Sequence, residues 1–357
     1  MLMLVTESQA ASHVTPMLHN KPGPVIPLYH PTSVLLVDDN EAFLRSLMLV
    51  LQDGFECFAF RDAAGAMAFL RSEAASLANL APELPDDEDA LMEHIRDPVQ
   101  RKLHLKVSRL PRLFADRTRF SRPSIVVADH AMPGLSGLDM LETLRGLPQR
   151  KVLLSGTVDE DRARAALASG LIDAYQPKQQ PGLHDSLIAR LKALQFDYFG
   201  EVTRPFEPAL AGADTRFLQD GAFVQAFARF AAAHGIVEHC VLMQPPGILG
   251  LDESGTPTIL LVADDDYRQA SFEIAQAEHA PPELLRRLAS ASTVAVFPTA
   301  NGFYSREIGS NWSQFLWHST RLGQAGLRTA IISDPGVVRQ VCGSVSSYAE
   351  HRRRRIN

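Results

Sequence analysis

The chain has 357 residues, 46% of them hydrophobic and 21% charged, which is close to the usual composition of soluble globular proteins. Because a domain usually contains about 100–200 residues, this length predicts two domains. No apolar run approaches the roughly 20 residues that cross a bilayer, and the N-terminus lacks the positive start of a secretory signal. These features exclude membrane-spanning and exported classes and predict a cytoplasmic protein. Three scattered cysteines are too few for a disulfide framework, so we expect them to be buried or inert: Cys57, Cys240 and Cys342.

The net charge of −6 is unevenly distributed along the chain. Residues 94–122 contain nine Lys or Arg side chains and two acids, whereas residues 205–345 contain nine arginines, no lysine and fourteen acids, a net charge of −5. An acidic domain repels the phosphate backbone of nucleic acids. The second half also shows neither a helix-turn-helix with a basic second helix nor an RNA-binding aromatic motif, so binding to DNA is disfavoured.

The chain starts with residues 1–30, which show no clear hydrophobic period and are predicted to form an extended leader. The first strand is predicted over residues 33–37, because the continuous aliphatic run SVLLV is typical of a parallel strand buried on both faces. It ends at the polar sequence Asp38-Asp39-Asn40. Apolar residues at i, i+3 and i+4 spacing then predict an amphipathic helix over residues 41–52, which completes one β/α repeat.

A second repeat consists of a strand over residues 55–60 and an alanine-rich helix over residues 63–80. An insertion over about residues 81–122 follows it, with an acidic run and then the basic stretch. Because charge runs usually lie in solvent, we favour a solvated, charged helical hairpin here. The alternative is that its apolar residues dock one or two helices on the domain.

Three more repeats follow the insertion. Each strand is short and aliphatic, and each is followed by a helical pattern. The predicted strands are 124–128, 151–156 and 172–175, and the helices are 138–147, 159–169 and 183–194. Five alternating repeats indicate an α/β fold with a doubly wound, five-stranded parallel sheet of flavodoxin-like order, occupying residues 31–198 with the inserted helical segment. In such sheets ligands bind beyond the carboxyl ends of the strands, so functional residues are expected there.

Four of the predicted strands end on a specific polar group. Asp38 and Asp39 follow the first strand, Asp129 the third, Ser155 the fourth and Lys178 the fifth. With the sequences VLLVDDN and VVADHAMPGLSG, this ordered set resembles the receiver domains of bacterial two-component response regulators. The second sequence matches their phosphoacceptor loop D-x-x-M-P-G-x-x-G, whose matching loop positions here are Met132, Pro133 and Gly137.

The resemblance implies that Asp129 accepts a phosphoryl group and that Asp38, Asp39 and Asp129 bind Mg²⁺ together with the backbone carbonyl of Ala131. The chemistry is consistent with these residue types. A carboxylate and a phosphoryl group are both anionic, so transfer between them needs charge neutralisation and in-line positioning. Mg²⁺ supplies the neutralisation and prefers hard oxygen ligands.

The resemblance also implies three contacts on the phosphoryl side of the site. Lys178 pairs with the acceptor and then with phosphoryl oxygens, Ser155 donates to a phosphoryl oxygen, and Tyr175 changes rotamer when the loop after Ser155 moves inward. Alternatively, Tyr175 is only a half-buried strand aromatic. One position departs from the family: Lys178 is followed by Gln179 rather than by proline, and a cis bond there would cost about 2.5–4 kcal/mol. We therefore expect a rebuilt loop after the fifth strand.

The second domain is predicted as an α+β fold over residues 211–348, after a linker at residues 199–210. An apolar stripe predicts a helix over residues 217–234, and three aliphatic runs separated by turn residues predict an antiparallel meander. Asp264-Asp265-Asp266 then opens a helix, where carboxylates complement the helix dipole. The basic tail at residues 349–357 is expected to be solvated and disordered.

As a whole, the chain resembles two-domain response regulators that include quorum-sensing ones. This resemblance implies a cytoplasmic phosphoprotein that a sensor histidine kinase or a phosphotransfer protein phosphorylates. Its second domain would act on a protein partner, and phosphorylation could produce a homodimer. Beyond its own phosphorylation and dephosphorylation we expect no enzymatic activity. Two alternatives stay open for the second domain: an unrecognised enzymatic or nucleotide- or ligand-binding output, and direct transcriptional regulation.

Overall fold

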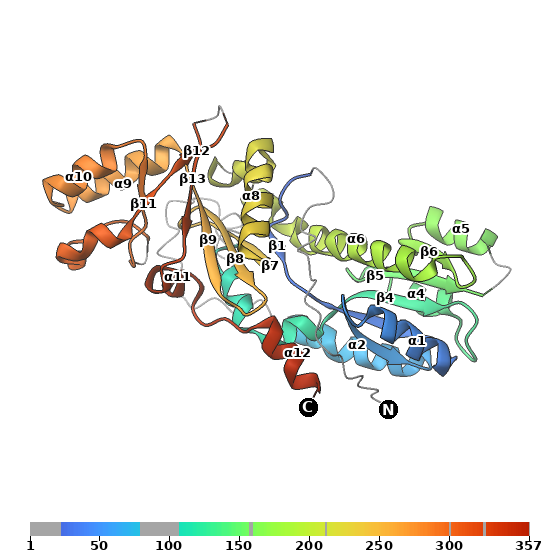
Figure 1. Cartoon of the computed structure of the whole chain (residues 1–357). Coiled ribbons are helices and arrows are strands. Elements are labelled where there is room, and N and C mark those ends of the chain that lie inside the picture. The colour runs from blue at the N-terminus through green and yellow to red at the C-terminus, as the bar shows by residue number, and fades with distance from the viewer. Residues whose placement is uncertain are drawn as a thin grey trace.

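The computed structural model describes residues 23–78, 107–156, 160–210, 213–299, 301–323 and 326–356. These residues form two units, each built on its own main sheet (Figure 1). Within the described residues, no helix has the length and apolarity needed to span a membrane.

The first sheet is parallel throughout and has the strand order β3-β2-β4-β5-β6. Its central strands are aliphatic and buried along their whole length, as expected for a sheet covered on both faces. The strands are β2 (Ser33–Val37), β3 (Glu56–Phe60), β4 (Pro123–Asp129), β5 (Arg150–Ser155) and β6 (Ala174–Pro177). The predicted doubly wound receiver fold is therefore confirmed.

Helices cover both faces of this sheet. One apolar cluster lies under α1 and α6, and a second lies under α2, α4 and α5. The helices are α1 (Glu41–Leu51), α2 (Ala63–Ala78), α4 (Gly137–Thr143), α5 (Glu160–Ala168) and α6 (Leu183–Thr203). Asn40 caps α1 by accepting a hydrogen bond from the backbone N–H of Phe43 at 3.1 Å.

The second unit has a mixed α+β architecture, as predicted. Its main sheet has the strand order β1-β7-β8-β9-β13-β12, and every neighbouring pair is antiparallel. The strands are β1 (Leu28–Tyr29), β7 (Ile236–Leu242), β8 (Gly247–Asp252), β9 (Pro257–Ala263), β12 (Thr320–Arg321) and β13 (Arg328–Ile332). A separate two-stranded sheet pairs β10 (Thr293–Ala295) with β11 (Leu316–His318).

Helices pack around this second sheet. They are α7 (Glu207–Leu210), α8 (Gly221–His234), α9 (Asp265–Ala277), α10 (Pro282–Ala289), α11 (Pro335–Cys342) and α12 (Tyr348–Ile356), with 3₁₀ segments η5 (Ala213–Gln219) and η6 (Arg306–Phe315). Asp264 caps α9 by accepting from the N–H of Tyr267 at 2.7 Å, which confirms a structural role for the first acid of that run. All three cysteines are buried, and none of them forms a disulfide bond.

The end of the leader belongs to the second sheet. Residues 1–22 lie outside the described part, but Leu28 and Tyr29 form β1 and pair with β7. The N–H of Val241 also donates to the carbonyl of Pro27 at 2.7 Å. The chain therefore contributes to the second domain before it begins the first strand of the receiver.

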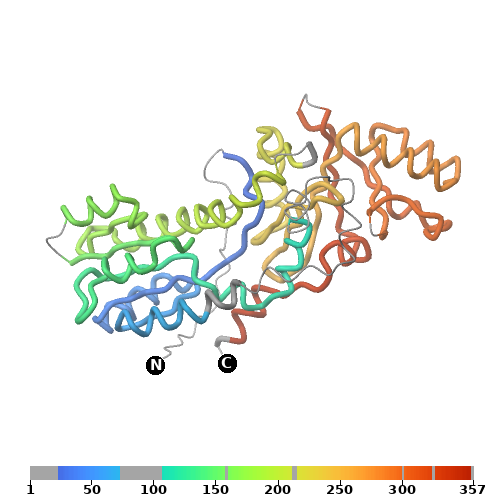
Figure 2. Tube along the Cα trace, turned by 180° about the vertical axis from the view of Figure 1, so that it is seen from behind, coloured from blue at the N-terminus to red at the C-terminus, as the bar shows by residue number. Residues whose placement is uncertain are grey.

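The insertion is not a solvated hairpin where it is described. Residues 79–106 lie outside the described part, whereas residues 107–122 run across to the second domain as η2 (Leu110–Ala115) and η3 (Arg117–Ser121) (Figure 2). Three of its arginines, Arg109, Arg119 and Arg122, are at most 8% exposed. The expectation of solvated charge was wrong for these three side chains. Arg119 is buried because hydrogen-bonding groups from distant parts of the chain surround it.

Two further segments are more ordered than predicted. The segment predicted as a linker, residues 199–210, is helical: α6 continues to Thr203 and is followed by η4 (Arg204–Phe206) and α7. The basic tail forms α12 rather than a disordered end, because Tyr348 and His351 pack on Phe120. His351 Nε2 also lies 2.6 Å from a carboxylate oxygen of Glu56 on β3.

Candidate functional site

Parallel pairing brings the polar strand ends together at one edge of the receiver sheet. In the register, Val37 of β2 is paired with Ala128 of β4, Asp129 with Leu154 of β5, and Ser155 with Pro177 of β6. The residues that follow or end these strands therefore lie side by side. The ends of β2, β4, β5 and β6 thus form one continuous edge of the sheet, which is the carboxyl edge predicted from the sequence.

Three carboxylates form a cluster at this edge. One oxygen from each of Asp38, Asp39 and Asp129 lies within 4.8 Å of the others. Asp38 and Asp129 are 1% and 4% exposed, whereas Asp39 is exposed, so the cluster is held by the fold on one side and open to solvent on the other. Such a set of hard oxygens fits Mg²⁺, which keeps several of its waters.

Lys178 supplies the positive charge that this cluster needs. Its Nζ lies 2.6 Å from Asp38 Oδ2 and 2.9 Å from Asp129 Oδ1. At these distances the ammonium is the counter-charge of both buried oxygens. The Phe43 ring lies under the ammonium, 4.6 Å from its centroid, which adds a cation–π contact.

The missing Lys-Pro step does not displace Lys178. Among the described residues the one cis peptide bond is Gln244–Pro245, so the bond from Lys178 to Gln179 is trans. The N–H of Lys178 donates to the carbonyl of Ser155 at 2.8 Å, which extends the pairing of β6 with β5 by one residue. The strand itself therefore positions the lysine, and the loop after it does not need the cis bond.

Burial controls the ionisation of Asp38. Desolvation raises the pKa of its carboxyl group above the ordinary value, and the nearby Asp129 carboxylate raises it further. Lys178 and the Asn40 N–H, which donates to Asp38 Oδ1 at 2.9 Å, oppose this shift. The protein thus holds buried negative charge in a setting that a cation would stabilise.

The loop after Asp129 depends on two glycines. A Cβ atom on Gly137 would lie 2.0 Å from the carbonyl oxygen of Asp129, so only glycine lets α4 begin this close to the acceptor strand. Gly134 has a φ of 83°, a conformation that favours glycine. Met132 is buried in the receiver core, while Ala131 and Pro133 are exposed.

The two predicted switch residues lie on neighbouring strands. Ser155 ends β5 and is 3% exposed. Tyr175 lies on β6, is half-buried, and packs against the core cluster under α2, α4 and α5. Both side chains are close to the acidic edge in sequence and register, and their movement remains a proposal.

Sequence reasoning missed two groups at this site. Phe43 belongs to the apolar pattern that predicts the helix over residues 41–52, and that pattern does not indicate that its ring contacts the ammonium of Lys178. The Asn40 N–H was not considered, although it donates to Asp38. The run DDNEAF contains both residues, but a local pattern does not show which distant lysine lies above the ring.

Comparisons with known proteins agree with this fold. No family model matches the chain, and no curated protein does. The structure of the Legionella pneumophila response regulator LqsR superposes with a TM-score of 0.67 at 22% identity, covering 92% of this chain and 95% of that one. A CheY-like receiver domain protein from Methanospirillum hungatei covers 48% of this chain and 98% of its own at 18% identity and a TM-score of 0.30. The superposition on LqsR shows that this chain shares its fold, a receiver-type parallel sheet followed by a second α+β domain.

Proposed function

We propose that this protein is a two-component response regulator that a sensor histidine kinase or a phosphotransfer protein phosphorylates on Asp129. One observation carries the proposal: Asp38, Asp39 and Asp129 cluster at the carboxyl edge of a receiver sheet with Lys178 bridging two of them. An acidic cluster alone occurs in many cation sites. A half-buried lysine on the same two carboxylates also places a positive charge beside the proposed acceptor, which fits phosphoryl transfer to an aspartate.

Each residue has a separable task in this proposal. Asp129 offers a carboxylate oxygen as the nucleophile. Asp38, Asp39, Asp129 and the carbonyl of Ala131 would hold Mg²⁺, which neutralises charge on the incoming phosphoryl group when it is bound. Lys178 can move from Asp38 to phosphoryl oxygens because its flexible stem already brings Nζ to the acceptor.

The switch in this proposal follows from the added charge. A phosphoryl group brings about two negative charges and three acceptor oxygens. Ser155, at the end of the strand beside Asp129, would donate to one of them and draw its loop inward. Tyr175 on the next strand would then follow into the vacated space, and the changed surface would favour a homodimer or a partner protein.

The direct test is phosphorylation with a small donor. The purified protein is incubated with Mg²⁺ and acetyl phosphate and then analysed by intact mass and size-exclusion chromatography. We expect the gain of one phosphoryl group, which Asp129→Asn abolishes and Asp139→Asn, a change at an exposed acid on α4, preserves. Failure of the wild type with acetyl phosphate and with a panel of histidine kinases would count against the proposal.

The output proposed for the second domain is contact with another protein, within a quorum-sensing pathway. Its acidic sequence favours a partner with basic groups over DNA. Copurification of a partner from cells should depend on Asp129. Strongly salt-dependent binding to DNA would instead indicate a transcriptional regulator.

A pocket in the second domain favours a second candidate function, a ligand-sensing output. The pocket has a volume of about 640 Å³. Its polar and aromatic lining includes Arg216, Asp220, Asp264, Asp266, Tyr267 and Phe303. Three carboxylates outnumber one guanidinium, which favours a small organic cation over a nucleotide. Calorimetric titration with spermidine and with ATP tests this: spermidine should bind and Asp266→Asn should weaken it, whereas binding of ATP alone would contradict the charge argument.

A further inference from the structure

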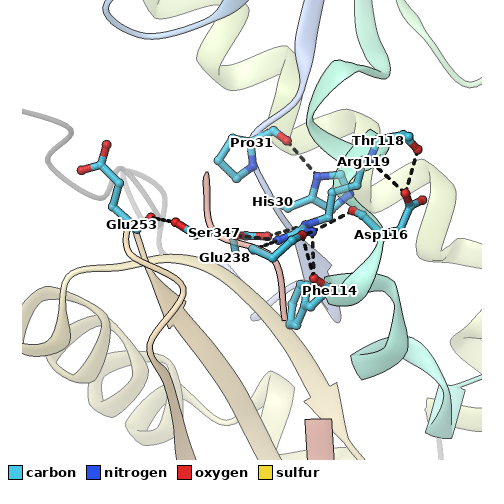
Figure 3. A network of polar contacts seen from close by, with 10 residues as sticks. His30, Pro31, Phe114, Asp116, Thr118, Arg119, Glu238, Glu253 and Ser347 are labelled. Carbon is cyan, nitrogen blue, oxygen red and sulfur yellow. Dashed lines mark hydrogen bonds and ion pairs between the residues drawn. The ribbon is translucent and has the colours of Figure 1, made fainter. Parts of the chain in front are cut away.

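A buried ion pair joins the insertion to the second domain. Arg119 of η3 and Glu238 of β7 are 1% and 0% exposed. The pair is bidentate: Arg119 Nε donates to Glu238 Oε2 at 2.8 Å, and Nη2 donates to Oε1 at 3.0 Å (Figure 3). The two residues are separated by 119 positions in the sequence, so this contact fixes the path of the chain.

Every remaining donor of the guanidinium is also used. The two N–H groups of Nη1 are shared among three acceptors, namely the carbonyls of Phe114 and Asp116 at 2.9 and 2.8 Å and the hydroxyl of Ser346. Nη2 donates to the carbonyl of Ser346 at 2.7 Å. The Phe120 ring stacks on the guanidinium at 3.9 Å. The arginine is therefore satisfied entirely by protein groups, which is the condition under which a buried ion pair can be stable.

The apolar side chains of the insertion also pack in the second domain. Val107, Leu110 and Phe114 are 0–4% exposed and belong to the hydrophobic core of the second domain, not to either receiver cluster. Ser346, just before α12, also donates to the carbonyl of Phe114 at 3.0 Å. Residues 107–122, which we call the strap, thus lie within the receiver sequence but complete the core of the other domain.

The strap leads directly into the acceptor strand. β4 begins at Pro123, which directly follows the strap, and ends at Asp129. The carbonyl of Arg122 accepts from the N–H of Ser33 at 3.1 Å, which ties the strap to the start of β2. At a rise of about 3.3 Å per residue, roughly 20 Å of central strand separates the strap from the carboxyl edge.

We propose that the strap makes the receiver and the second domain a single cooperative unit, with the Arg119–Glu238 pair as its latch. Local stability in a two-domain chain is otherwise set by each core alone. Here the second domain lacks part of its core without residues 107–122, and the receiver cannot release them without breaking the latch. Loss of structure in either domain is then transmitted to the other.

The chain provides a natural probe for this proposal, because both tryptophans, Trp312 and Trp317, lie in the second domain. Urea unfolding of the full-length protein is followed by tryptophan fluorescence, which reports the second domain, and by far-UV circular dichroism, which reports both. We expect coincident transitions in the wild type. In Arg119→Met the tryptophan midpoint should fall to lower urea and the dichroism trace should split into two steps.

Matched variants separate the latch from a general loss of stability. Arg112→Met removes an exposed arginine of the strap and should leave the transitions coincident. Arg119→Lys keeps the charge without the bidentate fork, so it should fold even if Arg119→Met does not, with a tryptophan midpoint below that of the wild type. In Arg119→Met with Glu238→Gln, the midpoint should be no lower than in Arg119→Met, because the carboxylate no longer lacks its partner.

Three results would overturn the proposal. The first is a wild type whose two signals already unfold separately. The second is an Arg119→Met protein whose transitions stay coincident at an unchanged midpoint, and the third is strict additivity of the Arg119→Met and Glu238→Gln effects. None of these measurements depends on phosphorylation, so failure here is distinguishable from failure of the response-regulator proposal.

Discussion

The two ends of the receiver sheet use charged residues in opposite ways. At the carboxyl edge, buried oxygens of Asp38 and Asp129 contact the ammonium of Lys178. The cluster that they form is open to solvent through Asp39. At the amino edge, Arg119 is enclosed and every one of its donors has a protein acceptor. An incompletely satisfied cluster can accept a ligand, whereas a saturated one can only hold the structure. Solvent access and unused hydrogen-bonding capacity therefore distinguish a ligand site from a structural contact, although both clusters consist of charged residues.

The largest expected effect comes from the apolar part of the amino edge. Phe114 is fully buried, and Phe114→Ala should lower the free energy of unfolding by about 3–5 kcal/mol. Tryptophan fluorescence during urea unfolding measures the loss in the second domain. Leu49→Ala, at a leucine that is 57% exposed on α1, is the matched control and should change little. Equal effects of the two substitutions would show that the strap is not core.

His30 makes the amino edge sensitive to acid. Its ring is buried beside Phe199, with centroids 4.8 Å apart, and its pKa is lowered to about 3, chiefly by desolvation and to a smaller extent by Arg119 and Arg122. The unfolded chain binds the proton near pH 6.5, so stability should fall as pH drops from about 6.5 towards 3, by an amount on the order of 4 kcal/mol. Urea midpoints measured across this range test the slope, which His30→Phe should reduce. An identical slope in that variant would assign the acid sensitivity to other groups.

A smaller loss of stability, with a loss of chemistry, is expected at the carboxyl edge. In Gly137→Ala the new methyl group would overlap the carbonyl of Asp129, so the acceptor strand or α4 must shift, at about 1–3 kcal/mol. Phosphorylation by acetyl phosphate should slow by at least about tenfold, because in-line geometry is lost. Gly156→Ala, which meets nothing within 4 Å, is the control. Unchanged phosphorylation of Gly137→Ala would refute the geometric argument.

The smallest effect is predicted for the tail. His351→Ala removes the contact with Glu56 on β3 and should cost about 1–2 kcal/mol, since Glu56 is largely buried. Arg354→Ala breaks an exposed pair with Glu350 on the same helix and should cost less than about 0.5 kcal/mol. Thermal unfolding of both variants checks this order. The reverse order would mean that α12 does not dock through His351.

The carboxyl edge could be predicted from the sequence because its geometry is local to each strand end. Once SVLLV and SIVVA are recognised as parallel strands, Asp38 and Asp129 must lie together. The meander and the cap at Asp264 were predictable for the same reason. In these regions the hydrophobic pattern of each strand or helix, together with the polar residue next to it, determines the local structure.

The amino edge could not be predicted in this way, because its partners are distant in sequence. Arg119 was read as part of a solvated basic run, since nothing near it offers a counter-charge. The available signal was in the sequence of the second domain. Glu238 interrupts the apolar strand IVEHCVL, where an unpaired carboxylate would be costly. Such a residue indicates that a cation must come from elsewhere, but it does not identify which of the nine basic residues supplies it.

The path of the chain has a consequence for how this protein could be recombined. Before β2, within the insertion and along α6, the chain repeatedly leaves one domain to contribute to the other. A single crossover near residue 199 would transfer the second domain without β1 and without the strap. Replacement of the second domain by an unrelated one would expose the apolar residues of both segments, so the two halves of this gene are expected to be inherited together.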